Sequence, residues 1–321
     1  MIASLIAKKK AEKLAYPVSY FRRIAGHSIS PSLILSLPGA IKNADLIHLT
    51  ATYSFATLPV LALAKLIGRP VVWSPRGAIK ATHEWPNVPR KKFETVFEWF
   101  APKLAPSKTI ILATAQTEAD STQARMPNMR VEIVANGANI PEDDELTPRV
   151  WRPDGRLRLV FLSRLHKKRS RHSDTCNVQT SDNVELEVRN YLSQLQALVH
   201  DYDLQGRIRF LGHVDSEDKN AAFLNVDLFV LPTHSENFGI AIAESLAYGT
   251  PVITTTNTPW ARINEIDCGE CITLSVDELV SSIQRMEQKS LAESGQRGRE
   301  WIKKSFRMKS SMFVYMIFIH N

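Results

Sequence analysis

The chain has 321 residues, of which 44% are hydrophobic and 23% are charged. This length is enough for two domains of ordinary size, and the composition excludes a disordered or fibrous chain. The formal net charge of +7 favours an anionic partner, such as a nucleotide, a nucleic acid or the anionic face of a membrane.

The sequence predicts a protein of the cytoplasm. No apolar run approaches the roughly 18–20 residues of a membrane span, and the charges of residues 1–14 follow the apolar residues, the reverse of a signal peptide. The three cysteines are typical of a reducing compartment. Residues 268–271, "CGEC", have the spacing of a redox or metal pair. This is the minor alternative, because no second pair completes a zinc site and we expect no metal.

Short apolar runs alternate with helical patterns along the chain. Strands are predicted at 44–50, 69–75, 109–115, 130–136, 157–163, 207–214, 227–233 and 251–256. Helices are predicted at 58–68, which Gly68 and Pro70 end, and at 190–204. Such alternation predicts an α/β fold of the doubly wound type.

A polar, proline-containing stretch at 141–155 has no regular period and is interpreted as a linker. We therefore predict a first domain at 1–147, a second domain at 148–302, and a tail or helix at 303–321.

The stretch "SENFGIAIAESLAYGTPV" at 235–252 places Glu236 and Glu244 at either end of an apolar run. A buried helix has no use for unpaired carboxylates, and ligands of open α/β sheets bind beyond the carboxyl ends of strands. With a helix predicted over 238–249, the two acids lie about 12 Å apart along its axis. The amide groups at its start suit phosphate or hydroxyls, and those amides belong to Asn237, Phe238, Gly239 and Ile240. We infer that both acids bind one extended ligand.

These residues resemble the E-x7-E signature of the family-4 (group 1) retaining glycosyltransferases, which have the GT-B fold. Further segments of the same pattern follow in the family's order, at 45–59, 73–79, 113–121, 133–141, 159–168, 208–214, 257–263 and 295–302. The motifs "SPRG" and "TPW" are similar to those of a bacterial subgroup that builds lipopolysaccharide or exopolysaccharide.

The resemblance implies two Rossmann-like domains facing a cleft, with a nucleotide-sugar donor in the second and a glycan or lipid-linked acceptor in the first. Transfer proceeds with retention, without a metal or other cofactor. By the match, Glu236 contacts the donor sugar, Glu244 holds the ribose, and the amides at 237–240 lie near the sugar and phosphates.

The resemblance implies roles for cationic residues in two segments of the chain. Arg164 is implied to neutralise the pyrophosphate, with Lys168 and Arg169 as the candidates for a helping cation. Arg76 stands where many relatives carry a histidine and is expected to act electrostatically. His48 is one strand too early for that role and is expected to line the cleft or to pack.

Two departures from the family pattern concern larger segments. The first strand and its glycine-rich loop have no counterpart, so we expect a first domain truncated at its start. Residues 167–190 lack the expected glycines, and 169–183 within them are polar and show no helical period. Our hypothesis is a reading-frame slip in an adenine run, which the coding DNA tests. We therefore expect impaired activity.

Other functions are weighed against this prediction. The alternative is an inactive remnant that still binds a nucleotide sugar. Nucleic-acid binding through the basic run at 166–172 lacks interleaved aromatic residues or a recognisable motif, so we expect no nucleic-acid partner. A GT-B phosphorylase or an epimerase is the nearest enzymatic rival. Basic residues near the start are compatible with peripheral contact at the anionic inner membrane face.

Overall fold

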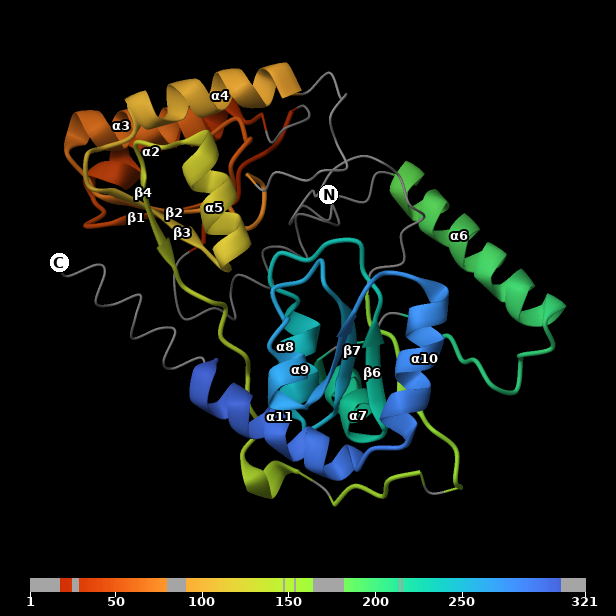
Figure 1. The fold of residues 1–321 in the computed structure, drawn as a ribbon. Helices are drawn as coiled ribbons and strands as arrows, with labels where there is room; N and C mark the ends of the chain where they lie inside the picture. The colour runs from red at the N-terminus through yellow and green to blue at the C-terminus, as the bar shows by residue number, and fades with distance from the viewer. Residues whose placement is uncertain are drawn as a thin grey trace. The chain divides into compact units, whose positions relative to one another are not determined.

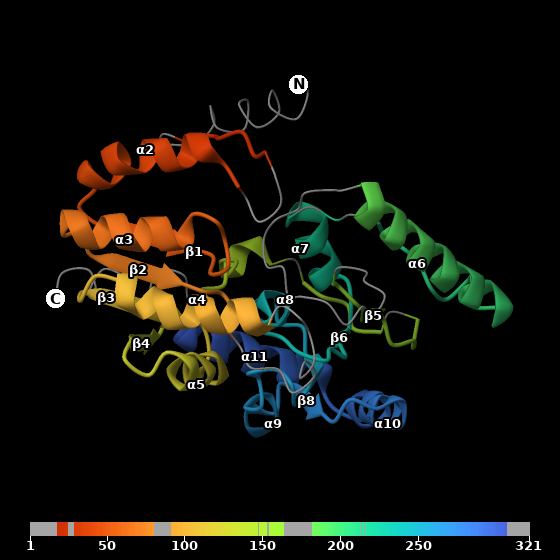
Figure 2. The same cartoon turned by 90° about the horizontal axis from the view of Figure 1, so that it is seen from above.

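The computed structural model describes residues 18–24, 29–79, 91–146, 148–152, 154–163, 182–212, 214 and 216–306. These residues form two compact units (Figures 1 and 2). The described residues up to 112, together with 121–132, make the first unit. Residues 113–120 and the described residues from 133 onward make the second.

The first unit is built on a parallel sheet. Its strands are β1 (Ile47–Thr50), β2 (Val71–Ser74), β3 (Thr109–Ala113) and β4 (Arg130–Ile133), in the order β1-β2-β3-β4. The helices of this part are α2 (Pro31–Lys42), α3 (Thr57–Ile67) and α4 (Lys91–Leu104), whereas α5 (Gln116–Arg125) is divided, with its residues up to 120 in the second unit and the rest in the first. Helices α2, α3 and α4 lie side by side in chain order (Figure 2).

The core of the first unit lies between its sheet and these helices. Trp73 of β2 is fully buried and packs with Leu61 of α3, Phe97 of α4 and Ile111 of β3. Gly68 ends α3 in the left-handed conformation with φ 81°, which glycine adopts without steric cost. The predicted helix at 58–68 and its glycine stop are therefore confirmed.

The second unit has its own parallel sheet. The strands are β5 (Leu159–Val160), β6 (Leu228–Leu231), β7 (Val252–Thr255) and β8 (Gly269–Ile272), in the order β5-β6-β7-β8. The helices are η1 (Asp143–Glu145), α6 (Asp182–Asp201), α7 (Ser216–Leu224), α8 (Ile240–Ala247), α9 (Ile263–Ile266), α10 (Val276–Glu287) and α11 (Leu291–Ser305).

Both faces of the second sheet are covered. Phe229 and Leu231 of β6 join one hydrophobic core with residues of α8 and α11, whereas Leu228 and Val230 join a second core with Met286 of α10. Alternate residues of a strand point to opposite faces, so this pattern places apolar layers on both sides of β6. The doubly wound α/β prediction is confirmed.

The predicted strand at 207–214 is wrong for the residues described there. Residues 207–212 and 214 have no regular structure, and Ile208 and Leu211 are exposed. The edge strand β5 has only two residues, so it offers a very short ladder to a further strand.

Three further segments differ from expectation. Strand β8 was not predicted because glycine and glutamate are poor strand signals. A Cβ on Gly269 would lie 1.9 Å from the Val252 carbonyl oxygen, so only glycine fits at this position.

Helix α6 begins at Asp182, within the stretch that showed no helical period. The stretch 141–155 is also more than a linker, because Arg149 and Arg152 within it bond to residues of the second unit. Among the described helices, none combines the length and the apolar content needed to cross a membrane.

Candidate functional site

The candidate site lies where β6 leads into α8. The helix starts at Ile240 after Gly239, which has φ 77°, so it begins two residues later than predicted and ends at Ala247. A Cβ on Gly239 would lie 2.9 Å from Ile242 Cδ1 and 3.3 Å from Trp260 Nε1. Both the backbone angle and the close approach therefore require glycine at this turn.

The amide groups at the start of α8 are available to a ligand. In the part of the chain that the structure describes, the amides of Asn237, Phe238, Gly239 and Ile240 donate to no other group. The Glu236 amide, by contrast, donates to the Asn257 carbonyl oxygen at 3.4 Å. Unpaired amides at the positive end of a helix dipole favour an anion or a polar oxygen.

The opposite end of α8 is closed by two arginines. The Arg149 guanidinium donates to the carbonyl oxygens of Tyr248 at 3.1 Å and Gly249 at 3.2 Å, and the Arg299 guanidinium donates to the Ala247 carbonyl oxygen. Burial lowers the pKa of Arg149 to about 10, so it remains cationic at neutral pH. The negative end of the helix is thus neutralised, while its positive end is left to solvent or a ligand.

Asn237 brings a polar side chain to the start of α8. Its Nδ2 donates to Thr114 Oγ1 at 2.6 Å and to Glu118 Oε2 at 3.0 Å, from residues that group with the second unit. Its Oδ1 is buried and accepts no hydrogen bond within the described residues. A buried acceptor without a donor is costly, so this oxygen is suited to a ligand hydroxyl. Glu236, the preceding residue, is half-buried.

Phe238 contributes its backbone and not its side chain. The ring is 5% exposed and packs against Trp260, with ring centroids 5.4 Å apart. The Trp260 indole donates to the Phe238 carbonyl oxygen. This contact fixes the loop, so among the groups of Phe238 only the backbone amide is left for a ligand. The side chain of Ile240 is exposed.

Glu244 has a partner that the sequence did not reveal. Lys219 Nζ of α7 lies 2.6 Å from Glu244 Oε1. In the described chain, Glu244 Oε2 accepts no hydrogen bond. Because Glu236 precedes the helix, only the step from Ile240 to Glu244 is helical, about 6 Å of rise, and the 12 Å estimate does not apply. No motif marks Lys219, which stands among polar residues of an unremarkable helix start.

A second polar cluster lies in the first unit. His48 Nε2 and Ser74 Oγ are 2.9 Å apart, on neighbouring strands that pair in parallel. Partial burial, and then the charge of Arg76, lower the pKa of His48, so His48 is neutral at pH 7. Arg76 is exposed and has φ 52°. The structure therefore places His48 beside Ser74 and within the electrostatic reach of Arg76.

The predicted cations Arg164, Lys168 and Arg169 lie outside the described residues. Their roles stay predictions from the sequence.

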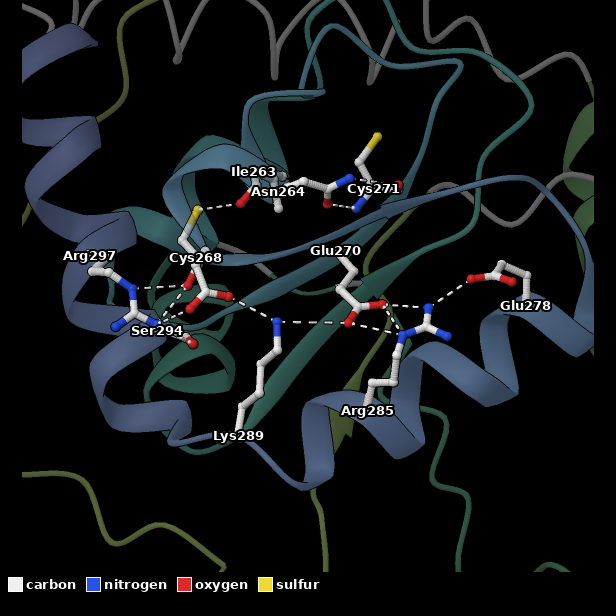
Figure 3. Close-up of polar contacts among 11 residues, drawn as sticks. Ile263, Asn264, Cys268, Glu270, Cys271, Glu278, Arg285, Lys289, Ser294 and Arg297 are labelled. Carbon is white, nitrogen blue, oxygen red and sulfur yellow. Dashed lines mark hydrogen bonds and ion pairs between the residues drawn. The ribbon is translucent and has the colours of Figure 1, made fainter.

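The two cysteines of "CGEC" do not form a pair. Cys268 and Cys271 are free and buried, and the Cys268 thiol lies 3.8 Å from the Ile263 carbonyl oxygen (Figure 3). Burial raises the pKa of Cys268 to about 12, so its thiol stays protonated at neutral pH. The described residues contain no cluster suited to a metal ion. A redox or metal role of "CGEC" stays the minor alternative from the sequence.

The outer edge of β8 carries polar contacts of its own. The Asn264 side chain accepts from the Cys271 amide at 2.7 Å and donates to the Cys271 carbonyl oxygen at 3.2 Å (Figure 3). Arg285 binds Glu270 and Glu278, each at 2.7 Å. These groups satisfy one another, so the cluster is structural.

Comparison with known proteins identifies part of the chain. Residues 188–303 match the family described as glycosyl transferases group 1. Mannosylfructose-phosphate synthase of Agrobacterium fabrum (strain C58) is 34% identical over 74 residues, 23% of this chain and 16% of that protein. Phosphatidyl-myo-inositol mannosyltransferase of Mycobacterium leprae is 27% identical over 136 residues, 40% of this chain and 36% of that protein. The matches thus span at most about a third of these relatives' length.

Solved structures resemble the chain over most of its length. HepE of Anabaena in complex with UDP-glucose has a TM-score of 0.67 at 17% identity, covering 95% of this chain and 86% of that one. A glycosyltransferase from Rickettsia africae has a TM-score of 0.68 at 15% identity, covering 98% and 86%. WaaG, a glycosyltransferase involved in lipopolysaccharide biosynthesis, has a TM-score of 0.58 at 16% identity, covering 92% and 85%. The chain therefore has the GT-B fold, and its residues 188–303 are similar to the glycosyl transferases group 1.

Proposed function

We propose that this protein is a glycosyltransferase that moves a sugar from a nucleotide-diphosphate donor to a glycan or lipid-linked acceptor. The observation that carries the proposal is the start of α8. There, four backbone amides and the unsatisfied Asn237 oxygen follow the carboxyl end of a parallel strand, directly after the half-buried Glu236.

The donor's charge distribution fits these groups. A pyrophosphate carries the negative charge that free amides and a helix dipole stabilise. Sugar hydroxyls donate to carboxylate and amide oxygens, which Glu236 and Asn237 supply. The complex of HepE with UDP-glucose supports a nucleotide sugar as the donor.

Glu244 is proposed to hold the ribose of the donor. Lys219 takes its Oε1, which leaves Oε2 for a ribose hydroxyl. A carboxylate fixed by a neighbouring ammonium is held in one orientation before the ligand arrives, so less entropy is lost on binding.

In the proposed reaction, the acceptor hydroxyl attacks the anomeric carbon of the donor and the nucleoside diphosphate leaves, with retention. Charge that develops on the leaving phosphate is stabilised by the α8 amides and by Arg164 with Lys168 or Arg169. Arg76 is proposed to act electrostatically in the same reaction. Fixed donors and cations of this kind supply the stabilisation that a metal provides elsewhere, so we expect activity to survive chelators.

The sequence motifs and the names of the relatives support our proposal for the acceptor and the pathway. The names of WaaG and the mannosyltransferase support a role in cell-surface polysaccharide or lipopolysaccharide biosynthesis. We place the protein in the cytoplasm, in peripheral contact with the anionic inner membrane face.

Calorimetric titration with UDP- and GDP-sugars, followed by a turnover assay, tests the proposal. Saturable binding of one donor with release of its nucleoside diphosphate supports it, and activity in EDTA supports the metal-free form. Binding without turnover, even with acceptor extracts, identifies an inactive nucleotide-sugar-binding remnant. If no nucleotide or nucleotide sugar binds, the proposal fails.

A further inference from the structure

Helix α4 turns apolar side chains toward solvent. Its Phe97 and Ala101 are buried in the core of the first unit. Yet Phe93 and Trp99 are each 57% exposed, and Val96 is 54% exposed. Phe100 is exposed as well and makes an edge-on contact with Trp99, with ring centroids 4.6 Å apart. A surface helix of a protein in water ordinarily carries polar residues on that side.

Two lysines lie among these aromatic residues. At 100° per residue, Lys92, Val96, Trp99 and Lys103 fall within about 60° of arc on α4. Both lysines are exposed, and Lys103 Nζ lies 2.8 Å from the centroid of the Trp99 ring. The outward side of α4 is therefore both apolar and positively charged. We call Lys92, Phe93, Val96, Trp99, Phe100 and Lys103 the α4 face.

The acids of α4 lie on the inward side. Glu98 is buried and accepts from Arg125 at 2.7 Å and from the Tyr53 hydroxyl. Glu94 is half-buried and interacts electrostatically with Tyr53 and Arg125. Positive and negative residues of α4 are thus separated onto opposite sides, and the α4 face carries no carboxylate.

We propose that the α4 face docks this protein onto the headgroup region of an anionic lipid bilayer. Tryptophan and phenylalanine insert at the boundary between headgroups and acyl chains, while lysines extend their ammonium groups to anionic headgroups. Docking at a bilayer deepens the proposed function, because a lipid-linked acceptor is presented at such a surface. The evidence for docking, however, comes from the α4 face alone. The α4 face is a different surface from the basic residues near the chain start, which the sequence suggested for membrane contact.

Charge distinguishes a lipid surface from a second copy of the chain. A symmetric pair of α4 faces brings the lysines of one copy against those of the other, because the same patch meets itself in a two-fold dimer. Like charges in contact are unfavourable. An anionic bilayer instead neutralises both lysines and covers the aromatic rings.

Flotation with vesicles of phosphatidylcholine, alone or mixed with phosphatidylglycerol, tests the proposal on the full chain. We expect binding to the mixed vesicles only. Reversing Lys92 and Lys103 together (K92E with K103E) should weaken it at least about tenfold, since each basic residue near an anionic surface adds about 1 kcal/mol. Trp99→Ser should weaken it about tenfold by removing an inserted aromatic side chain.

The controls change similar side chains in the second unit. Lys304→Glu reverses an exposed lysine of α11, and Val276→Ser replaces a 77% exposed apolar residue of α10. Each should bind vesicles like the unaltered chain. Circular dichroism verifies that all variants are folded.

Three outcomes decide the matter. Loss of vesicle binding in the α4 variants alone supports the proposal. Absence of binding to mixed vesicles, or binding that the α4 variants leave unchanged, overturns it. A dimer in sedimentation that Trp99→Ser dissociates also overturns it, in favour of a second copy. Nucleotide-sugar titration of the same variants separates this result from the proposed function, because we expect their donor affinity to stay unchanged.

Discussion

Helices α8 and α4 present opposite chemistry on similar architecture. Each lies in a unit built on a parallel sheet. Helix α8 buries its apolar side chains from Ile242 to Ala247, with the polar Glu244 and Ser245 between them, and leaves backbone amides at its start without partners in the described chain. Helix α4 turns its acids inward and exposes Phe93, Trp99 and Phe100. The same type of α/β architecture positions both helices. The residues on each helix decide whether it binds a small ligand or a lipid surface.

The strongest way to break this comparison is at Glu236. Glu236→Gln removes the negative charge beside the α8 amides while keeping the shape of the side chain. We expect the turnover rate to fall about 100-fold, similar to the loss of one preorganised group in other active sites. A steady-state assay with the donor found by calorimetry measures it.

The matched control for Glu236 is Glu300→Gln, at an exposed acid of α11 that bonds only to Gln296 among the described residues. Unchanged turnover is expected there. Equal rates for the unaltered chain and Glu236→Gln would remove the central role of Glu236.

The next test concerns how firmly α8 is held. A Cβ on Gly295 of α11 would lie 2.0 Å from the Gly249 carbonyl oxygen, so Gly295→Ala forces the two backbones apart. We expect the free energy of unfolding of the second unit to fall by about 3 kcal/mol. Urea denaturation should then show the second unit unfolding before the first.

Gly206→Ala serves as the comparison for this measurement, because nothing lies within 4 Å of a Cβ there. Its unfolding midpoint should stay within the error of the unaltered chain. A similar loss in both variants would show that α11 does not depend on close packing at Gly295.

A pH-dependent effect is expected at Asp227, whose side chain is fully buried. Burial alone would raise its pKa, but hydrogen bonds from Arg158 and from the Arg152 amide outweigh burial and lower it. The stability that it adds is present above the ordinary value of 3.8 and is lost as pH falls through the lower folded pKa. Asp227→Asn should lower the free energy of unfolding by about 2 kcal/mol at pH 7 and flatten its acid dependence in denaturant titrations.

The smallest effect is expected in the first unit, at His48. Burial and Arg76 lower its pKa below 6.5. Arg76→Gln should move the pKa upward, but not to 6.5, because burial remains. Proton NMR titration of the imidazole measures this, with Arg130→Gln as a control at an exposed arginine paired with Glu132. Since the folded pKa is the lower one, stability should decrease as pH falls below 6.5.

The site's place could be predicted from sequence because its signals are local. A buried strand, an acid and a glycine at the turn, and an apolar helix with a second acid occur within 25 residues, from Asp227 to Pro251. Their order alone places the acids beyond a parallel strand. The exact start of α8 could not be predicted, because it depends on Gly239 meeting Ile242 and Trp260, which lies 21 residues further along.

Contacts between distant residues explain the remaining misses. Lys219 reaches Glu244 from another helix, and neither residue signals the other in the sequence. The apolar pattern at 207–214 resembles a strand, but a strand also needs a partner, and β5 provides two residues. Conversely, residues 269–272 have a weak sequence preference for strand, but they form β8 because Gly269 packs closely against Val252 of β7.

Asn264 has a consequence for the assembly of the molecule. Its amide group imitates a neighbouring peptide and occupies both hydrogen-bonding groups of Cys271, so the outer side of β8 is partly sealed against recruitment of a foreign strand. At high protein concentration, strand pairing between copies of this chain is therefore hindered at the outer edge of β8. Such pairing is the step that leads to fibrils.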